Sequence, residues 1–147
     1  MNNLKQISKD IRKMVFKTAW KAGGGHIGGS FSMVEIVTAL YFGGILRYDA
    51  TKPLDKNRDR FILSKGHASL TLYATLAKAG FFPEEELYTF CQPGSKFGGH
   101  PKMYEVPGVE ASTGALGHGL GFGIGIALAG KLRKQDYKVF VLLGDGE

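Results

Sequence analysis

The sequence has little of what disulfide scaffolds, thiolate metal sites and membrane proteins need. Its single cysteine, Cys91, excludes an internal disulfide and any site built from several thiolates, and a loop or small packing role is expected for it. No apolar run approaches the roughly 20 residues that span a bilayer. The first segment mixes charges into the region where a signal peptide would carry its apolar core. We therefore expect a cytoplasmic protein that neither inserts into a membrane nor is exported.

What is present points to one globular unit. The 147 residues are 44% hydrophobic and 22% charged, which is enough to bury a single core. No internal repeat, low-complexity tract or domain boundary divides the chain. We interpret residues 1–147 as one domain.

The net charge of +6 raises the possibility of nucleic-acid binding, because basic residues recur at helical spacing near the N-terminus. They lie opposite an apolar face, so a solvated side of an amphipathic helix is the favoured interpretation, and nucleic acid is not expected as a partner. The basic residues are Lys5, Lys9, Arg12, Lys13, Lys17 and Lys21.

The order of predicted elements indicates an α/β fold. Residues 4–22 form a helical pattern that three glycines end, and a capping box at residues 32–35 predicts a second helix over 36–42, largely buried on all sides. Residues 61–63 read as a short buried strand, followed by a helix that ends near Gly80 and by a short helix after Pro83. The continuous apolar run at 138–143 is typical of a parallel strand covered on both faces. We expect a parallel sheet flanked by helices.

A glycine-rich helix is predicted over residues 114–132. Glycines in a helix interior cost up to about 1 kcal/mol each relative to alanine. Gly117, Gly121 and Gly125 share one face, so we expect this stripe to allow a close approach by another backbone, helix or ligand.

Three of the four histidines follow a glycine in predicted loops: His26, His67 and His100. Any one of them alone is more often a structural hydrogen-bonding residue. In an α/β sheet, however, loops after the strands converge on one crevice, so the three can meet there. Imidazoles donate hydrogen bonds and move protons near neutral pH, which suits an anionic or polyhydroxylated substrate.

Two further elements suggest a phosphate and a metal. Gly114 opens the glycine-rich segment, where backbone N–H groups and the helix dipole favour an oxyanion. Asp145 stands between two glycines directly after a buried strand, a natural place for a magnesium ligand. Each motif alone is weak, and an ordinary Asp-Gly turn is an alternative for the second.

Together and in this order, the motifs resemble the N-terminal part of transketolases, above all those members made as two separate polypeptides. The resemblance covers nearly the whole chain. The segments that carry it are Gly24-Gly25-His26-Ile27-Gly28-Gly29-Ser30, Leu63-Ser64-Lys65-Gly66-His67-Ala68, Gly98-Gly99-His100-Pro101, Gly108-Val109-Glu110-Ala111-Ser112-Thr113-Gly114 and the run from Leu143 to Glu147.

The resemblance implies a thiamine-diphosphate-binding fold and a role for each matching residue. Asp145 would bind Mg²⁺ (or Ca²⁺), Gly146 and His67 would contact the diphosphate, and His26 and His100 would lie near the reacting carbon and the sugar hydroxyls. The cofactor itself would be lined by a run of three residues, Gly114, Ala115 and Leu116. Two positions depart from the usual family pattern: His118 stands where many members have glutamine, and Lys102 where many have glutamate.

The implied activity is transfer of a two-carbon ketol unit between sugar phosphates, in the pentose phosphate pathway. The asparagine that completes the metal site, another histidine and the glutamate that activates the cofactor have no counterpart in residues 1–147. We therefore expect a C-terminally truncated partial domain that provides half a site, is inactive alone, and needs a C-terminal transketolase subunit or domain in a homo-oligomeric assembly. The alternatives are a related synthase that joins pyruvate to a sugar phosphate, and a non-catalytic interaction fragment.

Overall fold

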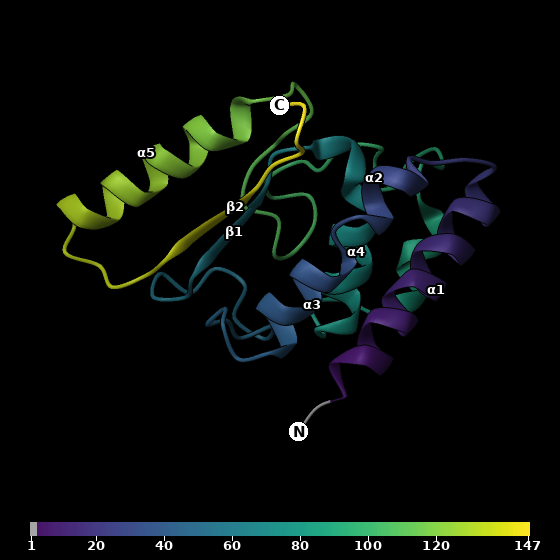
Figure 1. Cartoon of the computed structure of the whole chain (residues 1–147), viewed down its shortest axis with the longest axis horizontal. Helices are drawn as coiled ribbons and strands as arrows, with labels where there is room; N and C mark the ends of the chain where they lie inside the picture. The colour runs from purple at the N-terminus through teal and green to yellow at the C-terminus, as the bar shows by residue number, and fades with distance from the viewer. Residues whose placement is uncertain (1–2) are drawn as a thin grey trace.

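The computed structural model describes residues 3–147, which form a helical layer, a two-stranded parallel sheet and one helix on the other side of that sheet (Figure 1). In chain order the elements are α1 (Leu4–Ala22), α2 (Ile27–Phe31), α3 (Val34–Phe42), β1 (Arg60–Leu63), the 3-10 helix η1 (Gly66–Ala68), α4 (Ser69–Lys78), the 3-10 helix η2 (Glu84–Thr89), α5 (His118–Leu132) and β2 (Val139–Leu142).

Helix α1 has the predicted bounds because both of its ends carry stop signals. The Asn3 side chain accepts a hydrogen bond from the backbone N–H of Gln6, and Gly23 ends the helix at a φ of +77°. Its apolar face is buried against α3 and α4, while the six basic residues lie on the solvated side. Lys17 and Lys21 both sit over the ring of Tyr88. The prediction of a solvated basic face is confirmed.

The sheet joins β1 and β2 in parallel, with Phe61 opposite Phe140 and Leu63 opposite Leu142. These four side chains face the helical layer and join its core. Asp59 stands just before β1, and its carboxylate accepts hydrogen bonds from the backbone N–H groups of Arg47 and of Lys138, which stands just before β2. It thereby holds the starts of the two strands side by side. The prediction of a parallel sheet with helices on both sides is confirmed, but β2 is only partly buried, which corrects the expectation of full cover on both faces.

The glycines of α5 make a close approach on a different face from the predicted one. A Cβ on Gly119 would lie 2.5 Å from the Cα of Ser64, and one on Gly123 would lie 2.3 Å from a methyl group of Val141. Gly121 and Gly125 have nothing within 4 Å of an added Cβ. The stripe that packs on the sheet is therefore Gly119–Gly123, and the predicted Gly117–Gly121–Gly125 stripe was wrong.

Three other local expectations are corrected. The capping box at residues 32–35 does not form, because the Ser32 hydroxyl donates to the carbonyl of Gly29 and the short helix α2 occupies the loop before it. Helix α3 begins at Val34 instead of Ile36; it is largely buried, as predicted, with Ile36 as its exposed apolar side chain. Helix α5 begins at His118 instead of Gly114, with Gly117 in the left-handed region at a φ of +82° just before it.

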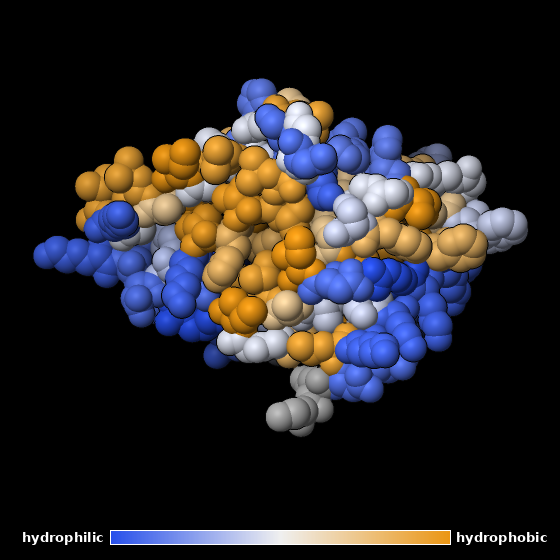
Figure 2. Space-filling model, in the orientation of Figure 1, coloured by the Kyte–Doolittle hydropathy of each residue, from blue (hydrophilic) through white to orange (hydrophobic). Residues whose placement is uncertain are grey.

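The outer side of α5 and the neighbouring strands carry apolar surface (Figure 2). The large apolar side chains exposed on this helix are Leu120, Phe122, Ile124, Leu128 and Leu132. Within residues 3–147, no helix is both long and apolar enough to cross a membrane.

Candidate functional site

A cavity of about 420 Å³ opens where the chain leaves β1 and β2. Its walls come from four segments far apart in sequence: helix α2, the turn after β1, the turn before α5 and the turn after β2. The lining residues are Gly28, Gly29, Ser32, Lys65, His67, Leu116, Gly144, Asp145, Gly146 and Glu147. Four of the residues singled out from the sequence, His67, Leu116, Asp145 and Gly146, therefore share one cavity. It lies at the carboxyl end of the parallel strands, where ligands of open α/β sheets bind.

The three loop histidines come together beside this cavity, as expected. The rings of His26 and His67 lie edge to face with their centroids 5.3 Å apart. Burial lowers the pKa of His67, and the nearby His26, Lys65 and His100 lower it further while Glu147 opposes them. His67 is therefore neutral near pH 7 and able to act as both donor and acceptor.

Glycines are required where the loops touch. A Cβ on Gly66 would lie 2.5 Å from the carbonyl oxygen of Thr113, and one on Gly114 would lie 2.9 Å from the His100 ring. The buried Thr113 hydroxyl in turn donates to the carbonyl of Leu63 at 2.6 Å. These contacts fix the segment that carries Gly114 and His100 against the end of β1.

Glu147 ties the turns of the site together. Its Oε1 accepts from the Ser64 hydroxyl at 2.9 Å and from the backbone N–H of Gly117 at 3.0 Å, and its Oε2 accepts from the N–H of Gly144 at 2.8 Å. Burial alone would raise the pKa of Glu147, but these hydrogen bonds outweigh it and lower the pKa. The ionised carboxylate thus links the ends of both strands to the start of α5.

The donors present fit a magnesium–diphosphate group. Mg²⁺ is usually held by one or two carboxylates together with phosphate oxygens and waters, and Asp145 offers one carboxylate to the cavity. Gly28 and Gly146 leave open space where a side chain would stand, so their backbone can approach a ligand closely. Among the residues that the structure describes, no three His, Cys, Asp or Glu side chains gather into a metal-binding cluster. A metal here would depend on the oxygens of a phosphate ligand.

The two departures from the family pattern lie outside the cavity lining. The Lys102 ammonium pairs with Glu105 at 3.3 Å on the surface. His118 is the first residue of α5, and its Nδ1 lies 3.3 Å from the carbonyl oxygen of Leu116. Ala115 is exposed in the turn just before α5, next to Leu116.

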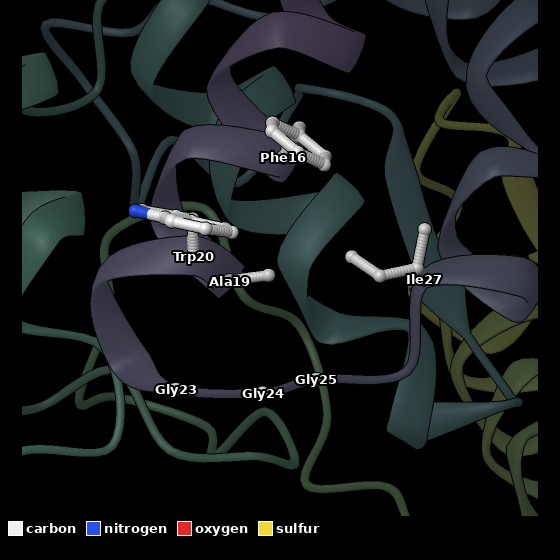
Figure 3. A pocket seen from close by; sticks show the side chains of 7 residues that line it. All are labelled: Phe16, Ala19, Trp20, Gly23, Gly24, Gly25 and Ile27. Carbon is white, nitrogen blue, oxygen red and sulfur yellow. The ribbon is translucent and has the colours of Figure 1, made fainter.

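A second hollow, of about 460 Å³, lies between the end of α1 and the start of α2 (Figure 3). The Phe16 and Trp20 rings stack on one side of it, with Ile27 opposite and the Gly23–Gly25 turn along its floor. Its walls hold no ionisable side chain, so they offer no acid, base or metal ligand. This hollow is therefore not a candidate for acid, base or metal chemistry.

Comparison with known proteins places this geometry in a family. The model of the transketolase thiamine diphosphate binding domain matches residues 3–146. The chain belongs to this family. The expected fold and the thiamine-diphosphate-binding character of the domain are thereby confirmed.

The similar curated proteins include subunits of transketolases. One subunit of the apulose-4-phosphate transketolase from Phocaeicola vulgatus is 49% identical over 140 residues, covering 95% of this chain and 49% of that protein. A 6-deoxy-6-sulfo-D-fructose transketolase subunit from a Clostridium species is 40% identical over 137 residues, covering 93% of this chain and 50% of that protein. The chain thus spans about half the length of these relatives and corresponds to their N-terminal part.

Solved transketolases have the same fold in this region. The Leishmania mexicana enzyme superposes with a TM-score of 0.91 at 30% identity, and the Campylobacter jejuni enzyme with 0.90 at 32%. Each covers 99% of this chain, which in turn covers 23% and 24% of those chains. These likenesses confirm the expected transferase family.

Lys65 and Glu147 are cavity residues to which sequence reasoning gave no role. Both stand in segments that were recognised, the turn after β1 and the turn after β2. A signal for Lys65 was available, because it directly follows a buried strand and Ser64 in a loop that should face the crevice. The contacts of Glu147 could not be read from sequence, since they join residues up to 83 positions away.

Proposed function

We propose that this chain supplies the diphosphate- and metal-binding half of a transketolase site. The observation that carries the proposal is the convergence of Asp145, Gly146 and His67 on one cavity at the strand ends, in a chain of the transketolase family. The Asp145 carboxylate would hold Mg²⁺ or Ca²⁺, while the Gly146 backbone and His67 would bind the diphosphate. Gly114, Ala115 and Leu116 would line the cofactor. Thiamine diphosphate, when bound, supplies the carbanion chemistry of ketol transfer.

His26 and His100 are proposed to act on the substrate. Both are exposed beside His67, so they can reach a ligand that enters the cavity from solvent. Their imidazoles would hold the hydroxyl groups of a sugar phosphate and move a proton near the reacting carbon. In this proposal the two histidines orient the substrate and transfer protons, and a second subunit supplies the remaining catalytic groups.

The partner, substrates and location are proposed on the same basis. The similar proteins are subunits of transketolases, which supports a C-terminal partner subunit for this chain. We further propose that the assembled enzyme is a homo-oligomer of such subunit pairs and works in the pentose phosphate pathway. The names of the similar proteins make apulose 4-phosphate and 6-deoxy-6-sulfo-D-fructose the first substrates to assay. The free, exposed Cys91 supports a reducing cytoplasm.

Replacing the proposed metal ligand tests the assignment. In the protein combined with a transketolase partner subunit, Asp145→Ala should abolish ketol transfer and metal-dependent binding of thiamine diphosphate. Asp136→Ala is the matched control, because that carboxylate is exposed on the connection between α5 and β2 and should leave both unchanged. Unchanged ketol transfer in the Asp145 variant would refute the role. Assaying pyruvate with a sugar phosphate alongside separates transketolase from the synthase alternative, which the family match disfavours.

A further inference from the structure

One charged side chain in the cavity, that of Lys65, forms no direct ion pair among residues 3–147. Lys65 is 7% exposed, and its ammonium donates to the Gly29 carbonyl at 2.9 Å and to the Ser32 hydroxyl at 2.8 Å. Both acceptors are neutral. Within residues 3–147, no carboxylate forms an ion pair with it inside 4.0 Å.

Such an arrangement is costly for the isolated chain. A buried ammonium loses the free energy of its hydration, and this loss is offset only if the ammonium is paired with an anion or fully hydrogen-bonded. Burial lowers the pKa of Lys65, while the carboxylates of Glu147 and Asp145, across the cavity, act in the opposite direction. Two of its three N–H donors have acceptors, and the third has none in the described part of the chain.

The cavity around it is suited to an anion. Lys65 is the only lysine or arginine among the lining residues, and it stands between the Gly28–Gly29 backbone and the turn that holds Asp145. Its Cδ would lie 3.6 Å from a Cβ on Gly144, so its stem packs against that turn while its ammonium reaches α2.

We infer that Lys65 is the cation that binds the diphosphate of the cofactor, held in place by Gly29 and Ser32. The inference rests on the proposed function and adds to it a charge that the Asp145, Gly146 and His67 assignment lacks. The diphosphate is an anion that would bind near the Asp145 carboxylate, so the two negative charges repel. The fixed positive charge of Lys65 on the opposite wall offsets this repulsion.

The test compares ligands with and without the diphosphate. In the two-subunit protein with saturating Mg²⁺, Lys65→Met keeps the apolar stem and removes the charge. It should weaken binding of thiamine diphosphate at least about tenfold, measured by calorimetry, and leave the binding of thiamine itself unchanged. The wild-type affinity for thiamine diphosphate should also fall more steeply with added salt than that of the variant. Lys65→Arg should restore most of the affinity.

Controls separate this role from a structural one. Lys52→Met removes an exposed ammonium on the connection before β1 and should change neither affinity nor salt dependence. Ser32→Ala removes one anchor of Lys65 without its charge, and should cost less affinity than Lys65→Met. Should Lys65→Met fail to fold, Lys65→Gln, which keeps a donor toward the Gly29 carbonyl, is measured in its place.

The possible outcomes distinguish failure of the proposed function from failure of the Lys65 role. If the wild-type assembly does not bind thiamine diphosphate, the proposed function falls and this inference falls with it. If the wild type binds and the uncharged variant binds equally well, or loses thiamine and thiamine diphosphate to the same extent, only the role of Lys65 is refuted.

Discussion

Helices α1 and α5 are of similar length and use opposite means of packing. Helix α1 buries an apolar face that includes Ile11 and Val15 and leaves lysines to solvent. Helix α5 fully buries only glycines, Gly119, Gly123 and Gly130, and exposes Leu120, Ile124, Leu128 and Leu132. The first is stabilised by apolar area inside this chain, and the second by close backbone approach to the strands. The position of α5, and of the turn before it that lines the site, therefore depends on close backbone contact more than on buried apolar area.

The same substitution in the two helices should show the difference most strongly. Ile11 is fully buried on α1, whereas Ile124 on α5 is 61% exposed. Ile11→Ala should lower the free energy of unfolding by about 2–5 kcal/mol, because it leaves a cavity in the core. Ile124→Ala should change it by less than about 0.5 kcal/mol. Urea denaturation of both variants checks this, and equal losses would refute the contrast.

A pair of glycine substitutions within α5 sharpens the comparison. Gly119→Ala places a methyl group against the backbone of Ser64 and should destabilise the fold by about 1–3 kcal/mol. Gly121→Ala enters open space and should stabilise it by up to about 1 kcal/mol through helix propensity. The thermal melting temperatures of the two variants should shift in opposite directions. A stable Gly119→Ala variant would mean that α5 does not lie against β1 as described.

The smallest expected effect is the pH dependence that Glu147 gives to the turns around the site. Its pKa is lowered in the fold below the ordinary 4.5, so the carboxylate stabilises the fold above that pH, and this stabilisation is lost as the pH falls through the lowered value. Glu147→Gln should therefore have a lower melting temperature than the wild type at neutral pH. This difference in melting temperature should become smaller in acid. A gap that stays constant with pH would contradict the hydrogen-bonded carboxylate.

The fold could be read from the sequence where a periodic pattern ends at a clear stop signal. Helix α1 and strand β1 are such cases, because an apolar period runs up to a glycine or a polar turn. Helix α2 was missed because two of its five residues are glycines. The start of α5 was placed four residues early, because a helical pattern cannot show that Gly117 adopts a left-handed conformation.

The site was predictable to a similar degree. The histidine loops and Asp145 were found because glycine flanks each of them, although only His67 and Asp145 stand in turns that directly follow a strand. The glycine stripe was misassigned, because glycines spaced by four residues look the same in sequence whether they face a strand or solvent. The contacts with Ser64 and Val141 show that Gly119 and Gly123 are the packed pair. The roles of all the predicted site residues stay predictions: His26, His67, His100, Gly114, Ala115, Leu116, Asp145 and Gly146.

Titration of thiamine diphosphate tests the central claim most directly. It is added to the chain alone and to the chain with a transketolase partner subunit, each with and without Mg²⁺, and binding is followed by calorimetry. The account predicts weak binding to the chain alone and tight, Mg²⁺-dependent binding to the two-subunit assembly. Tight binding by the chain alone, or binding by the assembly that does not depend on the metal, would contradict the half-site.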